Sequence, residues 1–165
     1  MSAITIRRAV SGDREAICRL YHEFHEFHVR GVKGRLLSLG EPPDTYEHSD
    51  LYQTLASIIA DDNSVIFLAE TAGQLVGLAE LYLRQDDPNP LRKLYRYGHL
   101  QSMIVTQAFR RKGIGTSLLE AAHKWAREKG AIEMRLDIWE FGEGPLVFYE
   151  NNDYRTLRRT LVRDL

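Results

Sequence analysis

The spacing of apolar residues divides the first half of the chain into strand-like and helix-like segments. Alternation of apolar and polar positions is typical of a half-buried strand, whereas apolar residues every three or four positions indicate an amphipathic helix. Strands are expected at Ile4–Arg8, Val65–Glu70 and Leu75–Arg84, and helices at Asp13–Val29 and Asp50–Ala60. The turn at Ala72–Gln74 is expected to join the second and third strands as a tight hairpin.

The second half of the chain continues this pattern. Strands are expected at Gly98–Thr106, Ile132–Trp139 and Tyr154–Val162, and helices at Thr116–Lys129 and Gly144–Asn151. No repeat, low-complexity tract or linker divides the sequence, so we expect residues 1–165 to form a single domain. The order β-α-α-β-β-β-α-β-α-β predicts an α+β fold with a sheet of mixed direction rather than a doubly wound sheet.

Composition narrows the class of protein. The chain has 165 residues, 44% of them hydrophobic, which suffices for one sizeable core. The formal net charge is -1, so there is no global basic field for nucleic acid. The single cysteine, Cys18, excludes an internal disulfide. Because no apolar run approaches the ~20 residues of a membrane span and no signal sequence is recognisable, we expect a soluble cytoplasmic protein without membrane or nucleic-acid partners.

The segment from Leu100 to Gly115 combines a buried strand, a basic turn and the start of a helix. The turn reads Arg-Arg-Lys-Gly-Ile-Gly from Arg110 to Gly115. Helix N-termini carry unpaired N–H groups and the positive end of the helix dipole, so this arrangement favours an anion such as a phosphate or pyrophosphate. The dinucleotide fingerprint does not fit, because the segment has only two glycines, follows cations and lies two-thirds along the chain. The nucleotide P-loop does not fit either, because Lys112 precedes Gly113. A basic turn that merely caps an ordinary helix is the alternative.

Two motifs resemble the GNAT superfamily of N-acetyltransferases. The form R-x-x-G-x-G after a strand is similar to its motif A, whose loop amides hold the pyrophosphate of coenzyme A. The segment from Phe148 to Tyr154, Phe-Tyr-Glu-Asn-Asn-Asp-Tyr, looks like the family's F-Y-E-x-x-G-F. Three positions depart from the family pattern: Asp153 replaces a usual glycine, Gly142 a frequent asparagine, and Pro145 a frequent alanine.

The resemblance implies a three-layer α/β/α architecture around a mostly antiparallel sheet with a splayed central strand. It also implies acetyl-coenzyme A as cosubstrate, with main-chain groups of the central strand beside the thioester and Tyr149 as the acid that protonates the thiolate. The cofactor-binding residues implied are Met103, Ile104, Val105, Arg110, Arg111, Lys112, Gly113, Ile114, Gly115, Thr116 and Phe148.

The sequence leaves open which residue acts as the base that deprotonates the amine. His99 ranks first, because an unperturbed imidazole pKa of about 6.5 suits neutral pH. Asp137, twelve residues before Tyr149, ranks second, and Glu80 ranks third. Two other readings keep the fold: a non-catalytic domain that senses acyl-coenzyme A, and an acyltransferase that uses another acyl group.

The acceptor is expected to be an amine of a small molecule or a protein. Acidic residues would favour a cationic acceptor: Glu80, Asp86, Asp87, Glu140 and Glu143. Three histidines, His22, His25 and His28, recur on the first long helix, but no further ligand is evident at metal-site spacing. We therefore expect a polar helix face near the substrate entrance and no metal, and a homodimer is possible.

Overall fold

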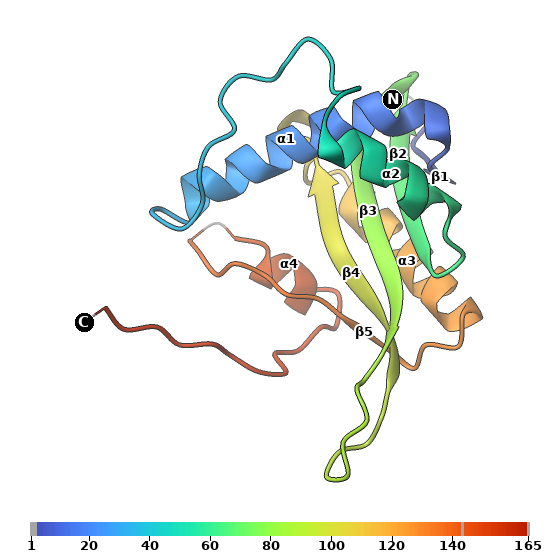
Figure 1. Cartoon of the computed structure of the whole chain (residues 1–165), viewed down its shortest axis with the longest axis vertical. Helices are drawn as coiled ribbons and strands as arrows, with labels where there is room; N and C mark the ends of the chain where they lie inside the picture. The colour runs from blue at the N-terminus through green and yellow to red at the C-terminus, as the bar shows by residue number, and fades with distance from the viewer. Residues whose placement is uncertain (1–2, 143, 165) are drawn as a thin grey trace.

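A mixed sheet of five strands, in the order β1-β2-β3-β4-β5, runs through the computed structural model, which describes residues 3–142 and 144–164 (Figure 1). The strands are β1 Thr5–Arg8, β2 Ser64–Thr71, β3 Gln74–Gln85, β4 Arg96–Val105 and β5 Glu133–Arg135. β1 to β4 pair antiparallel, and β5 joins β4 in parallel. Such a mixed, mostly antiparallel sheet confirms the predicted fold class.

Helices cover both faces of this sheet. The longer ones are α1 Arg14–Gly31, α2 Asp50–Ala60 and α3 Ile114–Glu128, and the shorter ones are η1 Ser11–Asp13, η2 Gln107–Phe109 and α4 Leu146–Glu150. α1 and α2 lie on one face and α3 on the other (Figure 1). None of the helices in the described ranges is long and apolar enough to cross a bilayer.

The core consists of two layers that follow from the alternation of side chains along the strands. On β3, Ala79 and Leu81 face α3, whereas Leu78 faces α1 and α2. Cys18 belongs to the α1/α2 layer and is fully buried, as the helical pattern predicts. Burial raises the pKa of its thiol to about 11, so Cys18 behaves as a small apolar side chain.

β4 and β5 pair over a short distance only. Tyr97, Gly98 and His99 lie opposite Glu133 to Arg135, and no further pairing of β4 with β5 occurs in the described residues. From Leu100 to Val105, β4 is therefore hydrogen-bonded to β3 alone, while the chain after β5 diverges from it (Figure 1). This is the splayed central strand that the resemblance implies.

Two expected strands differ from the structure. The segment Ile132–Trp139 pairs only at Glu133–Arg135, because the chain leaves the sheet where the strands separate. The closing strand expected at Tyr154–Val162 is wrong: this segment is irregular and runs away from the body of the molecule (Figure 1). Leu157 and Leu161 would share one face of such a strand, but Arg159 would lie between them on that same face, and both leucines are exposed.

Candidate active site

The turn between β4 and α3 has the backbone geometry of an anion site. Gly113 is the N-cap of α3 with a φ of 79°, in the left-handed region that glycine adopts without steric cost. The N–H of Ser117 donates to the Gly113 carbonyl at 3.0 Å, so the N–H groups of Ile114, Gly115 and Thr116 precede the first helical hydrogen bond. A Cβ at Gly113 would meet no atom within 4 Å, so the space beside this glycine is open.

The cationic side chains of the turn also shape it. Nε of Arg110 donates to the Val105 carbonyl at 2.8 Å, and its guanidinium lies 4.7 Å from the ring centroid of Phe27 on α1. Nζ of Lys112 donates to the Ala108 carbonyl at 3.1 Å. Arg111 is exposed and itself has a positive φ of 59°. These bonds keep positive charge beside the helix N-terminus and tie the turn to the end of β4.

Tyr149 is held in the core by neighbouring aromatic rings. It is 7% exposed and contacts the rings of Phe148 and Tyr154, and the ring nitrogen Nε2 of His123 lies 2.8 Å from the Tyr154 hydroxyl. Burial raises the pKa of Tyr149, so its phenol stays protonated at neutral pH and is able to donate a proton. Asp153 has a φ of 64° after α4, the left-handed conformation expected at a position where the family usually has glycine.

His99 lies on β4 next to the point where β4 and β5 separate. It is half-buried and pairs with Tyr82 on β3 and Arg135 on β5. Burial and the positive charge of Arg84 lower the pKa of its imidazole, against an opposing effect of Asp137. His99 and the exposed Asp137 are therefore close enough to interact electrostatically, and the lowered pKa favours a neutral imidazole.

Glu80, which is buried, and Tyr82, which is half-buried, form a pair on the face of β3 turned toward α1 and α2. The Tyr82 hydroxyl donates to the Glu80 carboxylate, which is 6% exposed. Burial raises the pKa of Glu80, and the hydrogen bond from Tyr82 partly opposes this. Tyr82 belongs to neither motif, although its position two residues after Glu80 on a strand places both side chains on one face.

The remaining acidic candidates differ in their partners and exposure. Asp86 binds Arg135 through two contacts, Nη1 to Oδ1 at 2.5 Å and Nη2 to Oδ2 at 3.0 Å, so it is committed to an ion pair rather than free for a cationic acceptor. This hydrogen bonding lowers the pKa of Asp86. Asp87 and Glu140 are exposed, and Glu143 lies outside the described residues.

The comparisons with known proteins agree with this geometry. A model of the acetyltransferase (GNAT) family matches residues 16–152. The chain belongs to the GNAT family of acetyltransferases. An aminoglycoside N(6')-acetyltransferase type 1 from Stenotrophomonas maltophilia is 31% identical over 137 residues, which make up 82% of this chain and 76% of that protein.

Solved structures share the fold at low identity. A mutant of the BH1408 protein from Bacillus halodurans has a TM-score of 0.85 at 19% identity, with 98% of this chain and 99% of that chain covered. An aminoglycoside N-acetyltransferase in complex with coenzyme A has a TM-score of 0.64 at 21% identity, with 99% and 96% covered. As a GNAT protein, the chain is an acyltransferase that takes acetyl-coenzyme A as its cosubstrate, as the sequence motifs predict.

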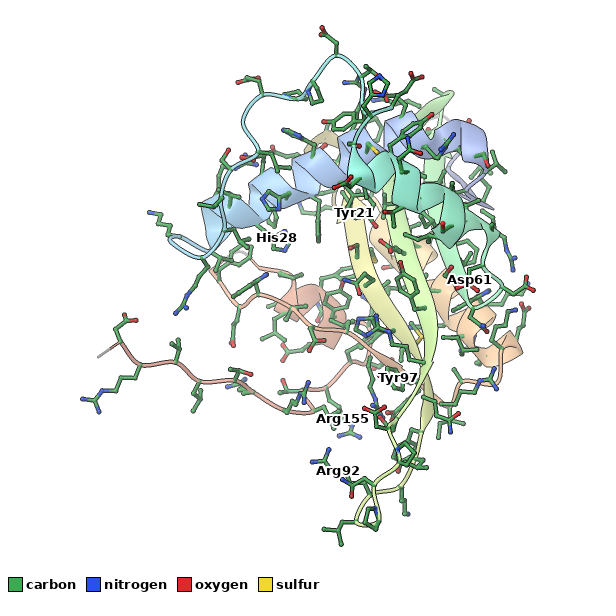
Figure 2. All side chains as sticks on the ribbon, viewed as in Figure 1. Tyr21, His28, Asp61, Arg92, Tyr97 and Arg155 are labelled. Carbon is green, nitrogen blue, oxygen red and sulfur yellow. The ribbon has the colours of Figure 1, made fainter. Side chains whose placement is uncertain are left out.

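The histidines of α1 hold the long loop that follows this helix. Nε2 of His22 lies 2.9 Å from the Gly40 carbonyl, and Nε2 of His25 lies 2.7 Å from the Leu37 carbonyl. Nδ1 of His28 contacts the carbonyl of Phe24 within the helix. In the described ranges, no three His, Cys, Asp or Glu side chains are grouped as a metal site requires. Figure 2 shows Tyr21 and His28 below α1, on the side of the helix turned toward β4 and α4.

Proposed function

We propose that this GNAT protein transfers an acetyl group from acetyl-coenzyme A to a primary amine by direct attack on the thioester. One observation carries the proposal: the edge of β4 that β5 leaves unpaired from Leu100 to Val105 is followed, after the short helix η2 and the basic turn, by the helix N-terminus at Gly113. A pyrophosphate at that N-terminus places the pantetheine arm along the free edge, where β4 offers main-chain donors and acceptors in place of a neighbouring strand.

The residues present fit the cosubstrate. The N–H groups of Ile114, Gly115 and Thr116 would bind the pyrophosphate, with Arg110, Arg111 and Lys112 supplying positive charge around it. The main chain of Met103, Ile104 and Val105 would bind the pantetheine arm and the acetyl oxygen. Acetyl-coenzyme A supplies the activated acyl group. Phe148 would border the cofactor from α4, since its ring already lies against Gly115.

Two proton transfers complete the reaction. His99 would take the proton that the amine loses as its nitrogen bonds to the thioester carbon, because its lowered pKa leaves Nδ1 or Nε2 free to accept. Tyr149 would donate its phenolic proton to the sulfur as the carbon–sulfur bond breaks, because its raised pKa keeps that proton in place until then. Asp137 acts on His99 electrostatically, and the raised pKa of Glu80 makes it the second candidate base.

The relatives support an amine acceptor. The Stenotrophomonas relative is named for acetyl transfer to an aminoglycoside nitrogen, and a relative from Trypanosoma brucei brucei is named a glucosamine 6-phosphate N-acetyltransferase. Both names describe transfer to nitrogen on a small molecule. We therefore assign this protein an amine acceptor, with the base and the acid as above.

The test combines binding and turnover. Isothermal titration with coenzyme A, followed by a thiol-release assay with acetyl-coenzyme A and a panel of amines, should show binding and amine-dependent release. Binding without release for every amine would favour a sensing domain instead. Faster release from longer acyl-coenzyme A thioesters would favour another acyl group, and absence of coenzyme A binding would overturn the proposal.

A further inference from the structure

A cavity of about 300 Å³ lies between α1, the loop after it, the start of α2 and β4. Its walls include Cys18, Tyr21 and His22 from α1, Tyr46 from the loop, Leu51 from α2 and Ser102 from β4. An apolar cavity of roughly 150 Å³ is enough to hold benzene. The space beneath α1 is therefore large enough for an aromatic ring with a short side arm.

Two phenol groups on the wall of this cavity lack a partner. The hydroxyls of Tyr21 and Tyr46 are buried, and neither has a hydrogen-bond partner among the described residues. Tyr46 is only 9% exposed, and burial raises its pKa, so it remains a hydrogen-bond donor. Buried hydroxyls are nearly always paired in folded proteins, so two on one cavity wall indicate that a bound molecule supplies the acceptor.

The wall of the cavity is fastened in place. His22 and His25 contact the carbonyls of Gly40 and Leu37, and the carboxylate of Glu26 accepts the Leu39 N–H at 2.6 Å. Tyr46 is held through its own N–H, which donates to Glu15 at 3.0 Å. The cavity is thus formed by bonds that exist before any ligand arrives, and a ligand needs to order little of the loop.

The cavity borders the strand on which acetyl transfer is proposed. Ser102 is buried on β4, directly before Met103 to Val105, and it lies opposite Glu80 on β3. A molecule in the cavity therefore contacts the same stretch of β4 as the thioester in the proposed reaction. At Ser102 it lies beside the neighbouring strand β3, which carries the buried carboxylate of Glu80.

We infer that this cavity is the acceptor subsite, and that the acceptor is a primary amine on a compact aromatic or apolar body with one hydrogen-bond-accepting oxygen. The inference rests on the proposed function. The oxygen accepts from Tyr21 and Tyr46, the ring fills the space lined by Cys18 and Leu51, and the amine extends past Ser102. Among the described residues, none that lines the cavity carries a carboxylate, so nothing there neutralises a polycation such as an aminoglycoside.

Matched amines test this assignment. 4-Methoxyphenethylamine and 4-ethylphenethylamine have nearly the same shape, but only the first carries an accepting oxygen. We expect kcat/KM for the methoxy compound to be about fivefold to tenfold higher than for the ethyl compound, the ratio that corresponds to the free energy of one hydrogen bond. We also expect it to exceed kcat/KM for kanamycin. A preference for kanamycin or glucosamine 6-phosphate over both aryl amines would overturn the inference and leave the proposed acetyl transfer intact.

Variants of Tyr21 and Tyr46 test whether the preference for the methoxy compound arises in the cavity. Tyr21→Phe with Tyr46→Phe should reduce the methoxy preference to about one while coenzyme A binding persists, since each removes one hydroxyl at constant ring shape. Tyr52→Phe is the matched control, because that ring packs under Arg14 outside the cavity. A preference that survives the double change contradicts the assignment. If no amine releases thiol, the proposed function fails, but the cavity assignment is still tested by titrating 4-methoxyphenethylamine into coenzyme A-saturated protein. Weaker binding by the double variant than by the original protein supports the assignment. Unchanged binding, or no binding to either protein, refutes it.

Discussion

The ring of Phe148 on α4 lies against the backbone of Gly115 on α3: a Cβ at position 115 would stand 3.0 Å from Cζ of that ring. The contact joins α3, whose N-terminus is the proposed anion site, with α4, which carries Tyr149. The position of the proposed acid therefore depends on the absence of a side chain at residue 115.

Replacing Gly115 with valine should move Phe148 and disturb both halves of the site. The added methyl groups overpack the contact, which typically costs about 1–3 kcal/mol of unfolding free energy. We expect weaker coenzyme A binding in isothermal titration and a lower midpoint in urea denaturation. Gly12→Ala is a suitable control, because a Cβ there meets no atom within 4 Å and its φ is not positive. Unchanged coenzyme A affinity in Gly115→Val would contradict the assigned contact.

Gly113 tests conformation rather than packing. Its φ of 79° costs a residue with a Cβ about 1–2 kcal/mol, although the space around it is open. Gly113→Ala should therefore lower the unfolding free energy and the affinity for coenzyme A, and Gly113→Asn should lose less, because asparagine tolerates this conformation better. Denaturation curves and titrations of both variants decide it, and equal losses for alanine and asparagine would argue against backbone strain as the cause.

Tyr149→Phe removes the proposed proton donor while keeping the ring. We expect kcat to fall about a hundredfold or more, as for loss of a general acid, with coenzyme A affinity nearly unchanged. Tyr154→Phe serves as comparison, since Tyr154 contacts the same ring but bonds His123. Steady-state kinetics beside titration separate the two quantities, and a kcat equal to that of the original protein would remove Tyr149 from the mechanism.

The pH profile should report His99. A base acts in its neutral form, so kcat/KM should rise as pH increases through the pKa of His99 and level off above it. Burial lowers that pKa, which places the rise below the ordinary value of 6.5. Asp137 raises the pKa of His99, so Asp137→Asn should shift the rise to still lower pH, whereas Asp87→Asn should not. If the rise persists at the same pH in His99→Gln, the base is another group, and Glu80 becomes the candidate.

Most elements follow from the sequence because local periodicity determines them. α2 is an example: its bounds agree with the predicted Asp50–Ala60, and Ser49 caps it by accepting the Tyr52 N–H. The segment after Tyr154 fails the same reasoning, since β-branched and apolar residues occur there without strict alternation. β5 is shorter than predicted because its pairing with β4 ends where the sheet splits. The end of that pairing depends on both strands, so the sequence pattern of one segment does not reveal it.

The candidate site also has features that were predictable from the sequence and features that were not. The anion-binding character of the turn at Gly113 was predictable from its basic residues and glycines, and the role proposed for Tyr149 was implied by the resemblance to the GNAT family. The cavity under α1 was not predictable, because Tyr46 belongs to a loop without periodicity and lines the same cavity as Tyr21 only through the folded path of residues 32–49. The ion pair of Asp86 with Arg135 was equally hidden, since its partners are 49 positions apart.

That ion pair has a consequence for the length of the acyl group. Arg135 stands where β4 and β5 part, bound to Asp86 at the base of the β3–β4 hairpin and stacked 4.0 Å over the ring of Tyr97. The ion pair and the ring contact thus fix Arg135 at the point where the two strands separate. In the proposed arrangement the thioester would lie along β4 between Gly113 and this junction, so we expect a long acyl chain to meet the paired strands before an acetyl group does.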